Sequence, residues 1–187
     1  PQNGALQTRQ ASMATPKNFL HLWDDRFLYI TPAIQSGLTA RSSATVLASV
    51  SGHPFMLEAA DGTRTYCTAA VVAPHVARRL AVEGCGLLSL NIDPASVAYR
   101  MLSRQLGGHG IQVLDARRFG RLREGFEPAQ AGALDDAALQ ALSRGLVETI
   151  TGSPERRMPN DPRIERVLDA IRHRAGAVSL RELSAVA

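Results

Sequence analysis

The spacing of hydrophobic positions changes along the chain and separates a strand-rich part from a helical part. From Phe19 to about Asp115, short runs of β-branched and aromatic residues alternate with turn residues, which predicts β-strands. Asp61-Gly62 separates two such runs, 54–60 and 63–73, and this dipeptide between strands is a strong hairpin signal. Short strands at this close spacing favour a small antiparallel barrel or sandwich.

Helical spacing begins at residue 93. Asp93-Pro94 is typical of a helix start, so a helix is predicted from there to the stop signal Gly107-Gly108. A longer helix is predicted over 135–150, where leucine and isoleucine recur every three or four residues, close to a coiled-coil seam. The spacing does not decide whether these residues contact a second subunit or cover the barrel. They are Leu139, Leu142, Leu146 and Ile150.

Residues 161–187 carry the signals of two consecutive helices. Asp161-Pro162 caps and begins the first helix, an apolar face follows at helical spacing, and Gly176 ends it after three cationic residues. Ser179 and Glu182 fit the capping-box pattern. In this pattern the serine side chain bonds an exposed backbone N–H of the first turn, and the glutamate side chain reaches back to the serine N–H. The preceding segment 152–160 has glycine, prolines and charge without an apolar period, and it is predicted to be a linker.

These two capped helices resemble the opening of the DNA-binding domain of AraC-type transcription regulators, a bacterial family. The matching positions are Asp161, Pro162, Ile164, Ile171, Ser179, Leu180, Leu183 and Ala185. The alternative is an ordinary two-helix hairpin with good caps. In the family a recognition helix and a second helix-turn-helix follow, whereas this chain ends at Ala187, so we expect only the front of that domain here.

The part before these helices is similar to the cupin-type sensor of the same family. The segment 71–77 looks like the strand and turn that carry a Pro–His pair, and 87–94 looks like the strand leaving the barrel. The resemblance implies an α+β protein with five consecutive parts. They are a flexible arm at 1–18, a small antiparallel cupin-like effector-sensing barrel at 19–118, dimerisation helices at 119–151, a linker at 152–160 and an incomplete helix-turn-helix DNA-binding domain at 161–187.

Composition adds little to this interpretation and contradicts none of it. The net charge is +4, and Lys17 is the only lysine among 21 basic residues. Arginine suits phosphate contact, although a GC-rich genome produces the same bias. No apolar run reaches membrane-spanning length and no signal peptide is recognised. Cys67 and Cys85 lack metal-site spacing and indicate reduced side chains of a cytoplasmic protein.

Three sets of candidate site residues follow. A barrel sensor holds its ligand in the barrel mouth, where a few polar or aromatic groups orient it. The effector-binding candidates are Trp23, Tyr29, His53, Arg64, Tyr66 and His75. The candidates for DNA phosphate contact are Arg163, Ser179 and Arg181, which would position the protein without reading sequence. The four apolar residues of 139–150 are the candidates for a dimer interface.

No metal site or cofactor is expected. Metal-binding cupins typically have two histidines one residue apart and a glutamate a few residues later. In this sequence Ala77 occupies the position of the second histidine after His75, and Glu83 lies too far along the chain. No nucleophile elbow, phosphate loop or HExxH motif occurs, so no catalytic residue is assigned and an enzyme is not expected.

The resulting hypothesis is the effector-sensing and dimerising portion of an AraC-type regulator. It expects an unknown small-molecule effector, a homodimer, no membrane association, and DNA as a partner of the full-length protein only. Two alternatives remain open at this point. They are a cupin metalloenzyme acting on a small molecule and a dimerisation module without a ligand.

Overall fold

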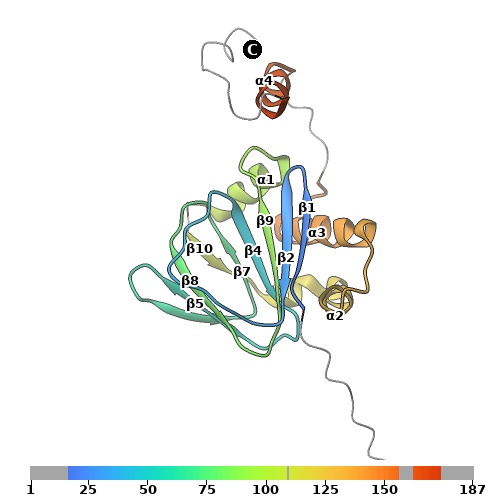
Figure 1. Cartoon of the computed structure of the whole chain (residues 1–187). Helices are drawn as coiled ribbons and strands as arrows, with labels where there is room; N and C mark the ends of the chain where they lie inside the picture. Colours follow the sequence, from blue (N-terminus) through green and yellow to red (C-terminus); the bar gives the residue numbers. More distant parts are fainter. Residues whose placement is uncertain (1–16, 109, 156–161, 174–187) are drawn as a thin grey trace, which may run out of the picture. The chain divides into compact units, whose positions relative to one another are not determined.

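The computed structural model describes residues 17–108, 110–155 and 162–173 (Figure 1). The chain divides into two compact units, Pro1–Pro154 and Glu155–Ala187, and each is described by itself. The division falls inside the segment 152–160, where the sequence predicts a linker. Of the predicted arm, only Lys17 and Asn18 lie among the described residues, and both are exposed.

The strands of the first unit form two antiparallel sheets. The six-stranded sheet has the order β1 (Phe19–Trp23), β2 (Arg26–Thr31), β9 (Leu87–Ile92), β4 (Ala44–Ser49), β7 (Ala69–Val72) and β10 (Ile111–Val113). The four-stranded sheet has the order β3 (Ile34–Gln35), β8 (Arg78–Val82), β5 (Phe55–Ala59) and β6 (Arg64–Cys67). The α+β class is confirmed, and so is the hairpin at Asp61-Gly62, because β5 pairs with β6 from Phe55↔Cys67 to Glu58↔Arg64.

The expectation of a closed barrel is wrong. Strand pairing runs within each sheet, so the β-structure is a two-sheet sandwich, and the chain crosses between the sheets several times from β2 to β9. The two sheets are joined by packing, because side chains of one face of each sheet form a shared apolar cluster. Its buried members are Leu47, Phe55, Leu57, Cys67, Ala70, Val72, Val82, Cys85 and Leu87.

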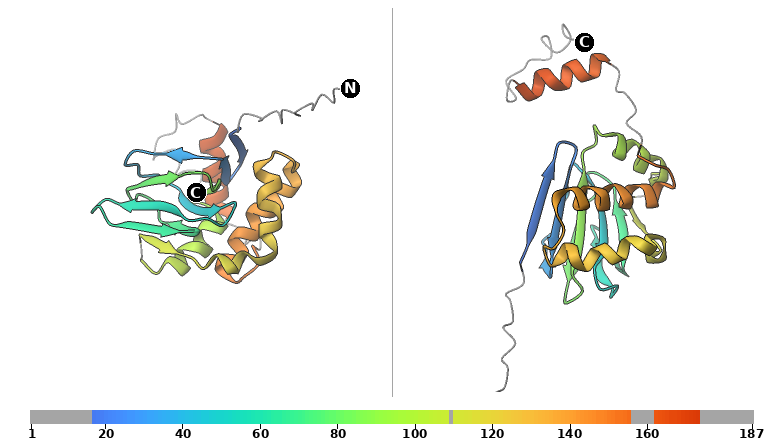
Figure 2. Two further views of the ribbon diagram at one scale, coloured as in Figure 1. Left: turned by 90° about the horizontal axis from the view of Figure 1, so that it is seen from below. Right: turned by 90° about the vertical axis from the view of Figure 1, so that its right-hand side faces the viewer.

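A layer of helices covers the other face of the six-stranded sheet, as the views of Figure 2 show. The layer contains α1 (Val97–Leu106), the 3-10 helix η1 (Ala116–Gly125), α2 (Phe126–Gln130) and α3 (Asp136–Thr151). Because both faces of the central strands are covered, β4 and β9 are buried along their whole length. Alternate residues of these strands therefore belong to different cores, one between the sheets and one beneath the helices.

Helix α1 begins later than the sequence predicts. Asp93 and Pro94 form a turn, in which the Ser96 hydroxyl donates a 2.7 Å hydrogen bond to the Asp93 carbonyl. Ser96 is the actual cap, since its Oγ accepts from the Tyr99 amide at 3.0 Å. The predicted stop is confirmed, because Gly107 ends the helix in the left-handed conformation at φ 53°.

The four residues proposed for a dimer interface lie inside the first unit. Leu139, Leu142, Leu146 and Ile150 of α3 are between 1% and 6% exposed and pack in the core beneath the six-stranded sheet. Their coiled-coil-like spacing is therefore explained by contact with this chain's own sheet. A second subunit would have to contact other residues of α3 or another surface.

In the second unit the structure describes one helix, α4 (Pro162–His173). It begins at Pro162, the first helical position that the sequence predicts. Residues 174–187, with Ser179, Arg181 and the predicted second helix, lie outside the described residues. The helix-turn-helix itself therefore stays a prediction. Arg163, the remaining candidate for phosphate contact, is exposed on α4.

Candidate functional site

A cleft of about 800 Å³ lies where the β1–β2 hairpin, the loop 40–43 and the start of the β9–α1 connection meet. It is the most favourable candidate site in the described part of the chain, because it combines apolar walls with several polar side chains. Its lining residues are Leu22, Trp23, Asp24, Asp25, Arg26, Phe27, Ala40, Arg41, Ser42, Ser43, Asn91, Asp93, Pro94 and Ala95.

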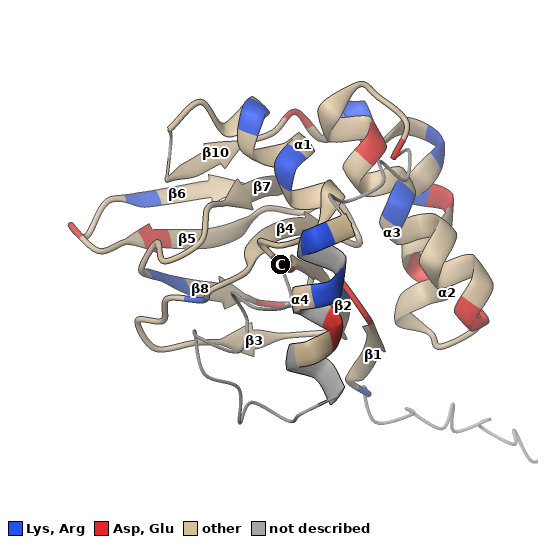
Figure 3. Ribbon diagram, turned by 90° about the horizontal axis from the view of Figure 1, so that it is seen from above, with Lys and Arg blue, Asp and Glu red and all other residues tan. Residues whose placement is uncertain are grey.

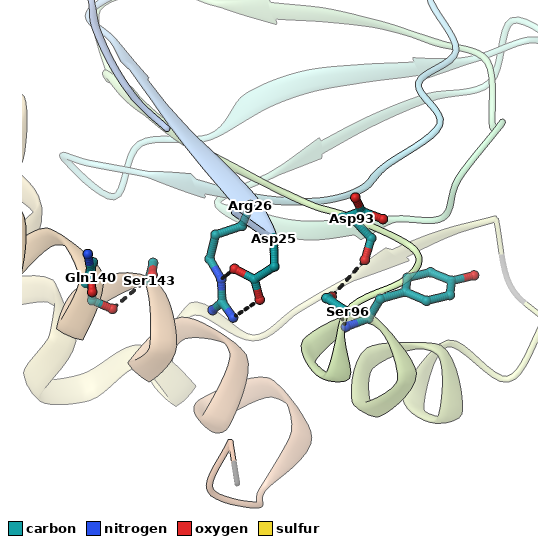
Figure 4. A network of polar contacts seen from close by, with 7 residues as sticks. Asp25, Arg26, Asp93, Ser96, Gln140 and Ser143 are labelled. Carbon is teal, nitrogen blue, oxygen red and sulfur yellow. Dashed lines mark hydrogen bonds and ion pairs between the residues drawn. The ribbon is translucent and has the colours of Figure 1, made fainter. Parts of the chain in front are cut away.

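One wall of the cleft contains a bidentate ion pair between two neighbouring residues of the hairpin. Arg26 Nε donates to Asp25 Oδ1 at 2.9 Å, and Arg26 Nη2 donates to Asp25 Oδ2 at 2.7 Å (Figure 4). The Arg26 side chain is only 7% exposed, and such a fork-to-fork geometry fixes both groups. This pair therefore fixes the positions of both side chains at the hairpin end of the cleft.

The floor of the cleft contains a polar network centred on Asn91. Asn91 Oδ1 accepts from Thr45 Oγ1 at 3.1 Å and from Ser43 Oγ at 3.4 Å. Its Nδ2 donates to the Ser89 carbonyl at 3.0 Å and to Ser89 Oγ at 3.2 Å. Asn91 is 1% exposed, so nearly all of its hydrogen-bonding capacity is used inside the protein. The network holds its donors and acceptors in fixed positions behind the cleft.

None of these polar residues is among the predicted site residues, although a signal for them exists in the sequence. In β9, Leu88, Leu90 and Ile92 point toward the helices, while Ser89 and Asn91 alternate with them and face the other sheet. Polar residues at every second position of a strand buried on both faces indicate a polar patch in the interior.

The six effector-binding candidates do not converge. Of the six, only Trp23 lines the cleft, and its Nε1 donates a 2.9 Å hydrogen bond to Asp136 Oδ1 of α3. Tyr29 is half-buried on β2, on the strand face opposite to Leu28 and Ile30. His53 is exposed in the loop between β4 and β5.

The remaining three candidates lie away from the cleft. Arg64 and Tyr66 are exposed on β6, and His75 is exposed in the turn between β7 and β8 with φ 62°. The backbone N–H of His75, in contrast to its side chain, has a defined role. It donates a 2.7 Å hydrogen bond to the carbonyl of Arg41, which ties the cleft loop to this turn.

Arg64 belongs to a charge cluster on the exposed face of the four-stranded sheet. Arg64 Nε and Arg79 Nη1 each lie 2.6 Å from a different carboxylate oxygen of Glu58, and Figure 3 shows the two blue positions on β6 and β8 flanking the red position on β5. The Arg64 hydrogen bond, followed by that of Arg79, holds the pKa of Glu58 below its ordinary value of 4.5. The cluster therefore accounts for Arg64 without a ligand.

The lowered pKa of Glu58 makes a prediction about acid stability. Because the folded-state pKa is below the unfolded one, the ion pairs stabilise the fold above about pH 4.5 and lose this effect as pH falls through the folded pKa. We expect the melting temperature of the wild type to exceed that of Glu58→Gln at about pH 6 and to converge with it in acid. Thermal unfolding across this range measures the effect. The exposed Glu124→Gln is the matched control, and a difference that does not vary with pH would contradict the prediction.

Within the described ranges, no group of three or more His, Cys, Asp or Glu side chains is placed to hold a metal ion. Both cysteines are free and buried, and desolvation raises the pKa of the Cys67 thiol to about 11. No helix in the described part of the chain is both long enough and apolar enough to span a membrane.

Taken together, the first unit is a mixed α and β protein with a two-sheet antiparallel sandwich, one helical layer and a polar cleft at one end. No family model matches the sequence, and no curated protein matches it.

The solved structures to which the chain is similar include the following three. The AraC-like transcriptional activator CuxR has a TM-score of 0.49 and 16% identity, over 88% of this chain and 69% of that chain. Apo ToxT of Vibrio cholerae has a TM-score of 0.45 and 7% identity, over 85% of this chain and 78% of that chain. A cupin domain of Bordetella pertussis has a TM-score of 0.33 and 14% identity, over 41% and 92% respectively. All three TM-scores are below 0.5, so the function of this chain is inferred from its own residues.

Proposed function

We propose that this chain is the effector-sensing portion of an AraC-type transcription regulator, joined to the front of its DNA-binding domain. The observation that carries the proposal is the order of its parts. A two-sheet sandwich with a polar cleft is followed by a helical layer, and a second compact unit then begins with the proline-started helix α4. This is the order that the sequence resemblance implies for a sensor, its dimerisation helices, a linker and a DNA-binding domain.

The cleft supports the sensing role because fixed polar side chains and an exposed loop meet there. The Asp25–Arg26 pair and the Asn91 network are fixed, whereas the loop 40–43 is largely exposed. A ligand that contacts this loop would favour one conformation of it over others. Regulation would then follow as a population shift, since a ligand changes an equilibrium by as much as its affinity differs between two states.

Dimerisation is part of the proposed function, although not through the four apolar residues of α3. Paired DNA half-sites are read by symmetric dimers, so a regulator of this type is expected to associate in pairs. Gel filtration with light scattering on the 187-residue chain measures its mass directly. The metalloenzyme alternative is distinguished by elemental analysis, because it requires a stoichiometric transition metal in the purified protein.

The DNA-binding role predicts a difference between this chain and a longer one. The 187-residue chain should bind duplex DNA weakly, without sequence preference and with strong salt dependence. The contacts expected of it are with phosphates, and phosphate contacts carry no sequence information. A chain extended through the roughly 70–80 residues that a double helix-turn-helix needs should select a defined sequence from a random duplex library. Fluorescence anisotropy at physiological salt compares the two chains. Specific binding by the shorter chain, or no selection by the longer one, would contradict the proposal.

A further inference from the structure

The strand β1 leaves one edge of the six-stranded sheet open. It pairs with β2 from Phe19↔Ile30 to Trp23↔Arg26 and is the last strand on that side of the sheet. Among the described residues, no backbone hydrogen bond outside this ladder involves β1. In the views of Figure 2, β1 lies at the margin of the sheet. Its outward N–H and C=O groups are therefore available to a further strand.

The other edge strands are protected against pairing, and β1 is not. Short length and charged side chains are common means by which proteins keep an open edge from accepting another chain. The edge strands β3 and β10 have only two and three residues, and β6 carries Arg64 in an ion pair with Glu58. In contrast, β1 has five residues and contains no Asp, Glu, Lys, Arg or Pro. By these criteria β1 is the edge best suited to receive a strand.

The side chains of β1 are divided between two faces. Phe19, His21 and Trp23 form a row in which neighbouring ring centroids are 6.5 and 6.3 Å apart. Phe19 and Trp23 pack against the core beneath the helices. Leu20 and Leu22 therefore point to the opposite face, where they are 56% and 70% exposed. A single exposed leucine is ordinary, but two at alternate positions of an unprotected edge indicate a protein contact.

The open edge is complementary to a second copy of itself. In an antiparallel ladder, successive residues bond alternately to one side and to the other. Trp23 pairs with Arg26 across a two-residue turn, so the odd-numbered residues of β1 bond β2 and both leucines bond outward. A two-fold axis at His21 would pair each leucine with the other leucine of the second copy through two hydrogen bonds. All five residues of β1 are paired in this register, and no like charges are placed opposite each other.

We propose that β1 is a dimerisation surface, at which two copies of this chain join their six-stranded sheets edge to edge around a two-fold axis at His21. The proposal rests on the regulator function proposed above and names the surface for the dimer which that function needs. A five-residue strand is about 17 Å long, so this edge buries less than the roughly 800 Å² per partner of a standard interface. The dimer is therefore weak by itself, and adjacent DNA half-sites would strengthen it by holding two copies together. Because Leu22 also lines the cleft, a bound effector would lie beside the paired strand.

Disulfide trapping in the 187-residue chain tests the register. In the proposed dimer the two copies of His21 form a non-hydrogen-bonded pair with Cα atoms about 4.5 Å apart, a distance that a disulfide can span. The matched control is Leu20→Cys, because the two copies of Leu20 are about 9 Å apart in this register and out of disulfide range. We expect His21→Cys to form linked dimers about tenfold faster than Leu20→Cys in air, although Leu20 is the more exposed position. Both native cysteines are buried, so they should not contribute.

Sedimentation equilibrium tests the interface without a cross-link. The wild type should dimerise reversibly, with a dissociation constant on the order of 10 μM. Leu20→Lys should weaken association about tenfold or more, because it places a charge against the partner's Leu22. Val113→Lys is the control, since Val113 is 51% exposed on the opposite edge strand β10, and it should leave association unchanged. Both lysine variants should unfold at nearly the wild-type temperature, because both positions are exposed.

Cross-linking of Leu20→Cys as fast as that of His21→Cys would overturn the inference, and so would a dimer that Leu20→Lys leaves intact. A wild type that stays monomeric at every concentration would also overturn it, and would leave the edge to another occupant, such as the segment 1–16. If His21→Cys does not fold, the two lysine variants decide the question. DNA selection by the extended chain is scored separately. A chain that selects a DNA sequence as a dimer insensitive to Leu20→Lys would keep the regulator function and lose this surface.

Discussion

Replacing Leu146 with alanine is expected to lower the free energy of unfolding by about 3–5 kcal/mol. Leu146 lies on α3, is 1% exposed and belongs to the core between the helices and the six-stranded sheet. Truncation removes buried apolar surface and leaves a cavity, because the covered sheet on one side and the helical layer on the other limit relaxation. Urea denaturation followed by circular dichroism measures the change. The slope of the unfolding free energy against urea concentration should be the same in both proteins.

The matched control lies on the same helix. Ala141 is exposed on α3, and Ala141→Ser should change the free energy of unfolding by no more than about 0.5 kcal/mol. The comparison also tests the interface hypothesis for the α3 leucines. If Leu146→Ala destabilised the protein by less than about 1 kcal/mol, or only at concentrations where subunits associate, its main contact would be a second subunit.

The second large effect is expected at Gly132, which follows α2. Its φ of 69° is strained for any residue with a Cβ, and an added Cβ would lie 2.6 Å from Cζ of Phe19 and 2.9 Å from Cε1. Left-handed strain of about 1–2 kcal/mol and overpacking of about 1–3 kcal/mol should together lower the free energy of unfolding by about 2–5 kcal/mol in Gly132→Ala. Chemical denaturation of the purified variant provides the measurement.

Gly62 separates the two causes of this loss. It has a φ of 86° and no heavy atom within 4 Å of an added Cβ, so Gly62→Ala should show the backbone strain alone. The difference between the two glycine variants then reports how tightly β1 is packed against the segment after α2. Equal losses would mean that the Phe19 ring moves aside freely and that β1 is loosely held. Phe19→Leu combined with Gly132→Ala should recover part of the loss in the opposite case.

The cleft could be predicted only in part. An aromatic residue with a polar tip suits a ligand site, and Trp23 does line the cleft. His53, Arg64, Tyr66 and His75 satisfy the same chemical criterion, but they lie on exposed loops or on the exposed sheet face. Residue type alone does not indicate the direction of a side chain. Strand register sets that direction, and register depends on pairing with strands distant in sequence.

Arg78 shows that residue type alone does not predict burial. Arg78 and Arg79 are neighbours in β8, yet they differ completely in environment. Arg79 is exposed and pairs with Glu58, whereas Arg78 is buried between the sheets. Alternation along a strand makes one of two neighbouring arginines face inward, and only the pairing of β8 with β3 and β5 decides which one it is.

Local signals determined much of the architecture by themselves. The β5–β6 hairpin, the helix stops at Gly107 and Gly152 and the start of α4 at Pro162 follow from conformational preferences of a few neighbouring residues. Tertiary structure alone decided that the strands form two sheets, that the α3 leucines pack on their own chain, and that Arg26, Arg41 and Asn91 line one cleft. Those outcomes depend on contacts between residues far apart in the chain, for which periodicity and spacing contain no information.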